Sequence, residues 1–319
     1  INRAPRDTGH LHHMPAHILF LTGDLGATME CSQRAVAADE RYIAGGGNAP
    51  FYLTSMCHDF HMQIYAGMHA GHYASAQLAA DRMSELLEAA LPYDGKQHMV
   101  TTMEGYYSMR FHVPIRFGKW DEAIENPPPP DADVYPVSMA MYHYARAVAF
   151  SAQSRLDEAR GAADEFYASV KKVHPDRFFF NNYATDILAV GEAMMRGEML
   201  YREGAYDQAF AALSAAVELD DDLFYSEPWP WMHPPRHALG ALLMEQGHIE
   251  RARDIYRDDL GLSGRIPHCK AHRNNIWALH GLAECLGRLG DKEAPKIEAL
   301  VTEQMRLSDQ QIVASCCCR

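Results

Sequence analysis

The stretch REGAYDQA, residues 202–209, is one of seven similar phrases that divide the chain into units. In each phrase a Gly or Ser interrupts a run of helix-favouring residues, and in five of the seven an Ala follows five positions later. Gly takes the left-handed conformation at which helices end with little steric cost. Each phrase therefore predicts a turn between two helices. The interrupting residues are Gly23, Gly71, Gly118, Ser154, Gly204, Gly247 and Gly290.

These turns recur 36 to 50 residues apart, and the segments between them show almost no strand signal. Apolar residues stand three and four positions apart, with Ala, Leu, Met and Glu frequent, which is typical of amphipathic helices. The sequence predicts an all-α fold of about fourteen helices in antiparallel pairs, forming one domain over residues 1–319. The run ENPPPPDADVYP, residues 125–136, cannot continue a helix because proline lacks the N–H donor. It predicts a break at 126–136, with the preceding helix short and ending near Asn126.

The turn phrases, with a small residue seven positions before most of them, resemble the tetratricopeptide repeat (TPR) family. Those earlier positions hold Ala16, Ala147, Gly197, Gly240 and Ala283, whereas Ile64 and Phe111 depart from the family pattern. The resemblance implies a right-handed α-solenoid of about seven repeats that binds a partner in its concave groove. More narrowly, GHLHHMPAHI at residues 9–18, with CHDFH at 57–61, resembles a bacterial-type group of TPR proteins with an H-x-x-H-M-P-[SA]-H-I phrase and no settled activity.

Composition excludes several classes of protein. The 319 residues carry a formal net charge of -13, with no Lys/Arg cluster, which argues against a nucleic-acid partner. The apolar runs are too short for a transmembrane segment. Seven cysteines, three of them in the terminal SCCCR, do not suggest a disulfide framework, and Cys316–Cys318 are expected to form an untethered tail rather than a thiolate site for a soft metal. The chain starts in mid-pattern, so we expect residues 1–8 to continue an upstream repeat. A soluble protein is expected, with a cytoplasmic location favoured and secretion left open.

Histidines recur at one register of the repeats. The positions ten residues before the turns are His13, His61, Ser108, Tyr144, Met194, His237 and His280. Four of these seven are His, although His makes up only 18 of the 319 residues. His10, His17, His58 and His112 fall at neighbouring offsets, so one face of the array should collect eight histidines. His237 and His280 would join the others only if the array curls nearly closed.

Three interpretations of this face stay open. The imidazoles can form a polar groove that binds a peptide, a protein or a small ligand. Alternatively His13, His17, His58 and His61 hold one transition metal, Zn, Cu, Ni or Fe, because imidazoles one turn apart can reach a shared ion. Asp59 could then orient a ligating imidazole. A histidine acting alone in acid–base catalysis is the third interpretation. No sequence motif identifies a reaction, so enzyme status is left undecided.

Further groove contacts are expected from segments between the helices. The complete set of expected groove residues is His10, His17, His58, His112, Tyr144, Arg177, His237, Arg273 and His280. The loop EPWPWMHPPRHALG, residues 227–240, is expected to pack between repeats rather than to form a lid over the groove. The exposed ends of a solenoid would also allow a homo-oligomer.

Overall fold

The structure is a computed structural model that describes residues 8–47, 49–90 and 97–319. The described residues are mainly helical, which confirms the all-α prediction. The helices are α1 (Gly9–Thr22), α2 (Leu25–Ala44), α3 (Ala49–Ala70), α4 (Tyr73–Ala90), α5 (Gln97–Ser108), α6 (His112–Arg116), α7 (Trp120–Glu125), α8 (Pro136–Ala152), α9 (Leu156–Val170), α10 (Ala184–Arg202), α11 (Tyr206–Asp222), α12 (Pro235–Glu245), α13 (Ile249–Asp259), α14 (Ile276–Leu289) and α15 (Ala294–Gln304). Short 3-10 turns lie at Met109–Phe111 and His268–Lys270. A small hairpin pairs β1 (Phe178–Phe179) with β2 (Asn182–Tyr183) in antiparallel register.

All seven predicted turn residues have a positive φ, between 60° and 84°. Six of them are Gly, and Ser154 adopts the same conformation at a φ of 60°. The five alanines that stand five positions beyond these turn residues are all fully buried: Ala76, Ala123, Ala159, Ala209 and Ala252. The turn phrases therefore mark real helix boundaries, and the alanines beyond them pack in the core. The prediction of a short helix before the proline run is also confirmed, because α7 ends at Glu125.

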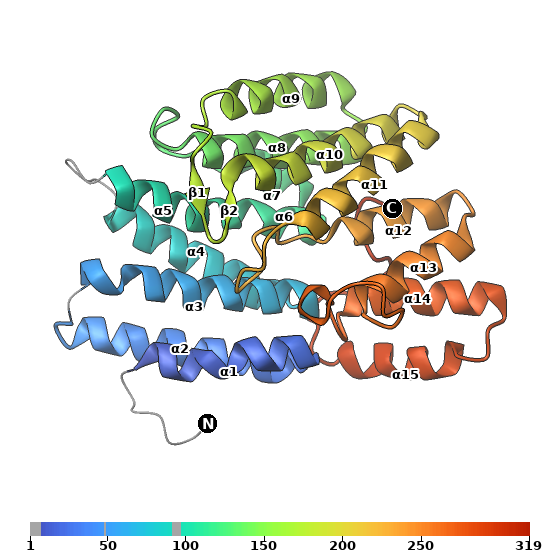
Figure 1. Cartoon of the computed structure of the whole chain (residues 1–319), viewed down its shortest axis with the longest axis horizontal. Coiled ribbons are helices and arrows are strands. Elements are labelled where there is room, and N and C mark those ends of the chain that lie inside the picture. The colour runs from blue at the N-terminus through green and yellow to red at the C-terminus, as the bar shows by residue number, and fades with distance from the viewer. Residues whose placement is uncertain (1–7, 48, 91–96) are drawn as a thin grey trace.

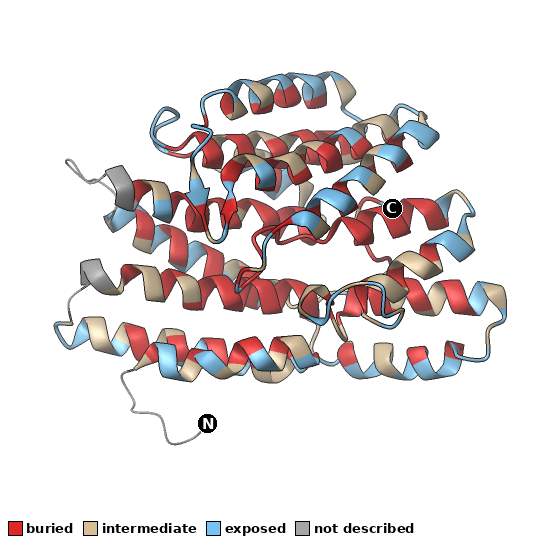
Figure 2. Ribbon diagram, in the orientation of Figure 1, coloured by how far each residue is buried: buried red, intermediate tan, exposed pale blue. Residues whose placement is uncertain are grey.

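Most helices pack mainly on a neighbour in the chain, and several also contact the helix two places on, as α1 does α3, α8 does α10, and α12 does α14. The stack runs from α1 and α2 to α9 and then returns, so that α14 lies beside α3 (Figure 1). Trp277 on α14 donates its indole N–H to the carbonyl of Met68 on α3, at 2.7 Å. Buried residues dominate α3, α12 and α14, whereas exposed residues cover much of α15 (Figure 2).

The C-terminal segment lies inside this arrangement, which corrects the expectation of an untethered tail. Cys316 and Cys318 are buried and joined by a disulfide. The segment is held because polar groups along it find partners on several helices. Ser315 Oγ lies 2.6 Å from the hydroxyl of Tyr256 and donates to the carbonyl of His237 at 2.9 Å. Asp309 accepts hydrogen bonds from the first two backbone N–H groups of α4.

Two further expectations concern the chain ends and the membrane. Residues 1–7, expected to continue an upstream repeat, lie outside the described part of the chain. Within the described part, no helix combines the length and the apolar character that crossing a membrane requires.

Candidate metal centre

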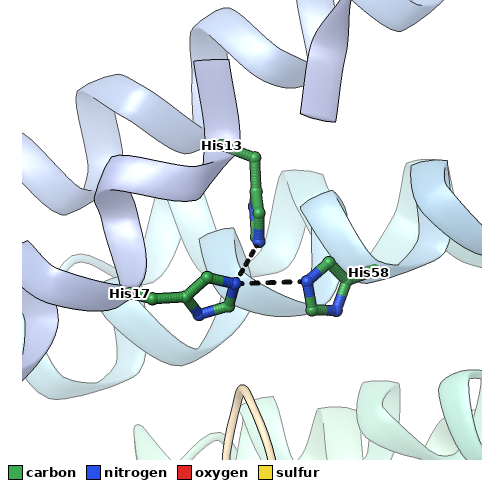
Figure 3. A group of neighbouring side chains, drawn as sticks. All are labelled: His13, His17 and His58. Carbon is green, nitrogen blue, oxygen red and sulfur yellow. Dashed lines mark hydrogen bonds between the residues drawn. The ribbon is translucent and has the colours of Figure 1, made fainter. Parts of the chain in front are cut away.

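His13, His17 and His58 meet between α1 and α3 (Figure 3). His13 and His17 stand four residues apart on α1, which places them on one face of the helix, one turn from each other. His58 reaches the same point from α3, which packs against α1. Pro15 lies inside α1 between the two histidines, in the middle of the helix, where it cannot donate a backbone hydrogen bond to the carbonyl of Leu11. The sequence spacing therefore supplies one pair, and helix packing adds the third ring.

The nitrogen atoms of the three rings converge closely. His13 Nε2 lies 2.7 Å from His17 Nε2, and His17 Nε2 lies 3.3 Å from His58 Nε2. The possible donor atoms of the three all lie within 4.8 Å of one another. Within the described residues, no other group of three or more His, Cys, Asp or Glu side chains brings its donor atoms this close.

Burial keeps these imidazoles neutral. Burial and then the neighbouring histidines together lower the pKa of His13 to about 2 and that of His58 to about 3. Burial also lowers the pKa of His17, against the opposing effect of Glu227. A neutral imidazole has one nitrogen lone pair free, which is the form that binds a metal ion. The three rings are therefore in the ligating form at neutral pH.

A buried pair of carboxyl groups stands behind His13. Asp59 Oδ1 lies 3.0 Å from His13 Nδ1, the ring nitrogen that faces away from the other two histidines. The two atoms lie at hydrogen-bonding distance but do not meet the geometry of a hydrogen bond. Burial and then the carboxylate of Asp39 raise the pKa of Asp59 to about 9. The raised pKa favours the protonated form of Asp59 at neutral pH, and its carbonyl oxygen can still accept from the N–H of His13.

The remaining two histidines expected at this place lie differently. His10 is exposed, with its ring centroid 5.8 Å from that of His13 and 6.0 Å from that of His58. His61 is fully buried and points elsewhere: its Nε2 lies 3.1 Å from Met232 Sδ, and its ring contacts Phe180. Three residues after His58, a side chain is rotated about 60° around the helix axis. This rotation removes His61 from the group that the structure brings together.

A fourth polar group approaches the three histidines from the loop before α12. Glu227 Oε2 lies 3.9 Å from His17 Nε2, and 43% of the Glu227 side chain is exposed. Trp229 and Trp231 of the same loop are buried, as expected for a loop that packs between repeats. Glu227 thus places a carboxylate on the solvent side of the histidines.

A second polar cluster surrounds Asp259. The Asp259 carboxylate lies 2.8 Å from His237 Nε2 and 2.9 Å from His272 Nδ1, and it accepts from Asn275 at 2.9 Å. The two histidines hold the pKa of Asp259 well below its usual range despite complete burial. His272 Nε2 in turn lies 3.0 Å from the hydroxyl of Tyr65. Of the histidines expected in the groove, His237 therefore belongs to this cluster.

The other expected groove residues are dispersed. His112 and Tyr144 are buried against Trp231, with ring centroids 4.7 Å and 5.2 Å from the indole. Arg177 pairs with the buried carboxylate of Glu104.

Two more of the expected groove residues belong to the C-terminal part of the chain and lie away from the three histidines. Arg273 packs between the turns at Gly23 and Gly261. His280 is half-buried on α14.

Several residues at the two clusters have no sequence signal. Asp39, Glu227, Asp259 and His272 belong to no recurring phrase, and nothing in their spacing links them to the histidines. Asp59 did carry a sequence signal, because it lies next to His58 in CHDFH. No known family model matches the chain, and no curated protein matches it as a relative.

Proposed function

We propose that this chain binds one divalent transition-metal ion, zinc in the first place, through Nε2 of His13, His17 and His58. The observation that carries the proposal is the convergence of three neutral imidazole nitrogens within 4.8 Å. Imidazole nitrogens suit Zn, Cu, Ni and Fe. Zinc is favoured because it commonly takes three protein ligands and leaves a fourth position open.

The distances fit such an ion after a small adjustment. In a tetrahedral site with Zn–N bonds of about 2.0–2.1 Å, two ligand nitrogens lie about 3.3 Å apart. The separation of His17 Nε2 from His58 Nε2 has this value already, at 3.3 Å. The 2.7 Å between His13 and His17 has to widen, which rotation of two side chains on one helix face can provide.

The surroundings also suit a metal. Ligating histidines usually donate their second N–H to a carboxylate, which fixes the ring and makes the ligand more basic. Asp59 stands in this place for His13. Glu227 lies on the solvent side of the histidines, near enough to occupy the fourth coordination position of the ion or to bind a water there. Metal sites with three protein ligands and an open position are typical of catalysis.

For the fold, we propose a TPR-like right-handed solenoid that curls until its last helices meet its first. Three observations support this: the seven left-handed turns, the buried small residues five positions beyond most of them, and the packing of most helices on a chain neighbour. The contact of α14 with α3 is the observation that supports the curl of the solenoid.

For the groove, we propose a small ligand rather than a peptide or a protein partner. The C-terminal segment occupies the interior, where Ser315 contacts Tyr256 and His237 and the carbonyl of Cys318 accepts from Arg202. A peptide would have to displace this segment and leave those buried polar groups without partners, which is costly. A small ligand can enter beside it.

The metal proposal is tested by zinc titration of the chelator-treated chain against a chromogenic competitor. We expect one tight site per chain and a loss of affinity of about 100-fold or more in His58→Ala, because two imidazoles hold zinc far less tightly than three. His61→Gln is the matched control, since it alters a buried histidine of the same helix outside the group. Circular dichroism checks the fold of each variant. Equal affinity in His58→Ala and wild type would overturn the proposal.

A further inference from the structure

A carboxylate from a distant part of the chain faces the three histidines. Glu227 Oε2 lies 3.9 Å from His17 Nε2, the nitrogen that also approaches His13 and His58. Glu227 belongs to the loop that joins α11 to α12, whereas His17 belongs to α1. The other carboxyl group near these rings, that of Asp59, lies at Nδ1 of His13 and therefore behind the ring. Of the two, Glu227 is the one that can reach an ion held by the Nε2 atoms.

The Glu227 carboxylate is oriented by its own loop. Its Oε1 accepts from the hydroxyl of Tyr225 at 2.7 Å, so Oε2 is the oxygen left to face His17. The loop is fixed in turn, because the carbonyl of Tyr225 accepts from the side-chain amide of Asn181 at 2.6 Å. Ligating carboxylates are usually hydrogen-bonded in this way by neighbouring groups. Glu227 therefore has the support that a metal ligand needs.

The distance fits coordination after a small movement. With Zn–N bonds of about 2.0–2.1 Å and Zn–O bonds of about 2.0–2.2 Å, a ligand nitrogen and a ligand oxygen lie about 3.4 Å apart in a tetrahedral site. The observed separation of His17 Nε2 from Glu227 Oε2 is 3.9 Å. The Glu227 side chain is 43% exposed, so its rotatable bonds can close the difference without disturbing the core.

Space and charge together favour Glu227 in the fourth position. The pocket that His17 and Glu227 line has a volume of about 20 Å³, room for a single water and not for a larger ligand. The candidates are therefore a water and the carboxylate. His13 and His17 are buried, and neutral imidazoles leave both positive charges of the ion uncompensated, which is costly away from bulk water. The carboxylate supplies a negative charge that a water does not.

The place of Glu227 in the fold gives this ligand a structural consequence. Its loop moves with the later helices, because Trp229 donates its indole N–H to Asp220 on α11 at 2.8 Å. At the far end of α1, the side-chain amide of Asn274 already joins the two parts of the chain by donating to the carbonyl of Gly23 at 3.2 Å. An ion bound by α1, α3 and Glu227 would add a stronger link between the same two parts.

We infer that Glu227 is the fourth protein ligand of the ion, and that the bound ion cross-links α1 and α3 to the loop before α12. The inference rests on the metal site proposed above. It replaces the open position by a closed set of four protein ligands, the arrangement of structural zinc sites. The ion then regulates how firmly the last part of the array is held against the first.

Zinc affinity of the chelator-treated chain is measured first, with the chromogenic competitor. Glu227→Gln should lose about tenfold or more, because an amide lacks the negative charge, while the three histidines keep binding detectable. The variant should fold normally, since Glu227 is partly exposed and the Gln carbonyl can still accept from Tyr225. Asp222→Asn, an exposed change at the end of α11, is the matched control. His10→Ala tests the exposed histidine beside His13 as the alternative ligand, and both should bind zinc like wild type.

Hydrogen exchange then tests the cross-link. Coupling between two sites is reciprocal, so saturating zinc should slow exchange in residues 222–229 of wild type by about the factor that Glu227→Gln loses in affinity. In Glu227→Gln, zinc should slow exchange in α1 and leave residues 222–229 unchanged.

Three results would overturn the inference: equal zinc affinity in Glu227→Gln and wild type, exchange in residues 222–229 that zinc does not slow in wild type, or a loss of affinity in His10→Ala instead. Zinc binding that falls in His58→Ala and not in Glu227→Gln would leave the metal proposal standing and refute this one alone. A wild-type chain that binds no zinc would refute both.

Discussion

His17 Nε2 lies 3.3 Å from His58 Nε2, although 41 positions separate the two residues in the chain. The contact exists because α1 packs directly on α3, the first helix of the next helix pair. Both helices present their histidines to the same point. A histidine pair within one helix is thereby extended to three rings. The following predictions rest on this arrangement and on the packing that maintains it.

Asp59→Asn should weaken zinc binding by about tenfold or more, because a bound cation favours the ionised form of Asp59, which accepts the His13 N–H more strongly than an amide does. The competitor titration that measures zinc affinity checks this. Asp121→Asn, an exposed change on α7, is the control and should leave the affinity unaltered. An Asp59→Asn chain that binds zinc as tightly as wild type would remove Asp59 from the site.

Acid should destabilise the fold from about pH 6.5 downward because of buried histidines such as His112. Burial lowers its pKa from 6.5 to about 3, so between these values the unfolded chain binds a proton that the folded chain does not. Stability therefore falls as pH falls through this window, by about 1.4 kcal/mol per pH unit for each such residue.

His112→Gln should reduce the pH dependence of the free energy of unfolding by close to one proton. Urea denaturation at several pH values between 7 and 5 gives that slope. The exposed His174→Gln serves as the comparison and should keep the wild-type slope. Identical slopes in all three proteins would show that His112 does not contribute.

Asp309→Ala should lower the free energy of unfolding by about 1 kcal/mol, the usual cost of losing a helix cap. The Asp309 carboxylate accepts from the backbone N–H groups of Tyr73 and Ala74, at 2.7 and 2.8 Å, and so attaches the C-terminal segment to α4. Chemical denaturation measures the loss, with Gln311→Ala in the same segment as the control. An unchanged stability would mean that the segment is held by its buried residues alone.

Ser154→Gly should raise the free energy of unfolding by about 0.5–1 kcal/mol. Ser154 has a φ of 60°, a conformation that Gly adopts without the strain of a side chain. The reciprocal change, Gly204→Ser at the equivalent turn, should lower stability by a similar amount. Thermal unfolding of both variants decides the matter, and changes of the same sign in the two would contradict the explanation.

The sequence predicted the helical fold and its boundaries because the decisive chemistry there is local. A Gly such as Gly204, an Ala five positions later and a proline run after Asn126 each act within a few residues of themselves. The pairing of His13 with His17 is local in the same sense, since helix geometry alone places them one turn apart.

The rest of the site depends on how the helices curve and pack, which periodicity does not encode. His61 shares its register with His13, yet its ring turns toward Met232, a residue 171 positions away. The approach of Glu227 to His17 and the link from Tyr65 to His272 join opposite ends of the chain. They exist only because the last helices return to the first.

A crystal of the chain grown with one equivalent of zinc, measured on both sides of the zinc absorption edge, tests the central claim most directly. The account predicts a single strong anomalous peak within about 2.0–2.2 Å of Nε2 of His13, His17 and His58. A map with no peak between α1 and α3, or with zinc bound only at exposed histidines elsewhere, would contradict it.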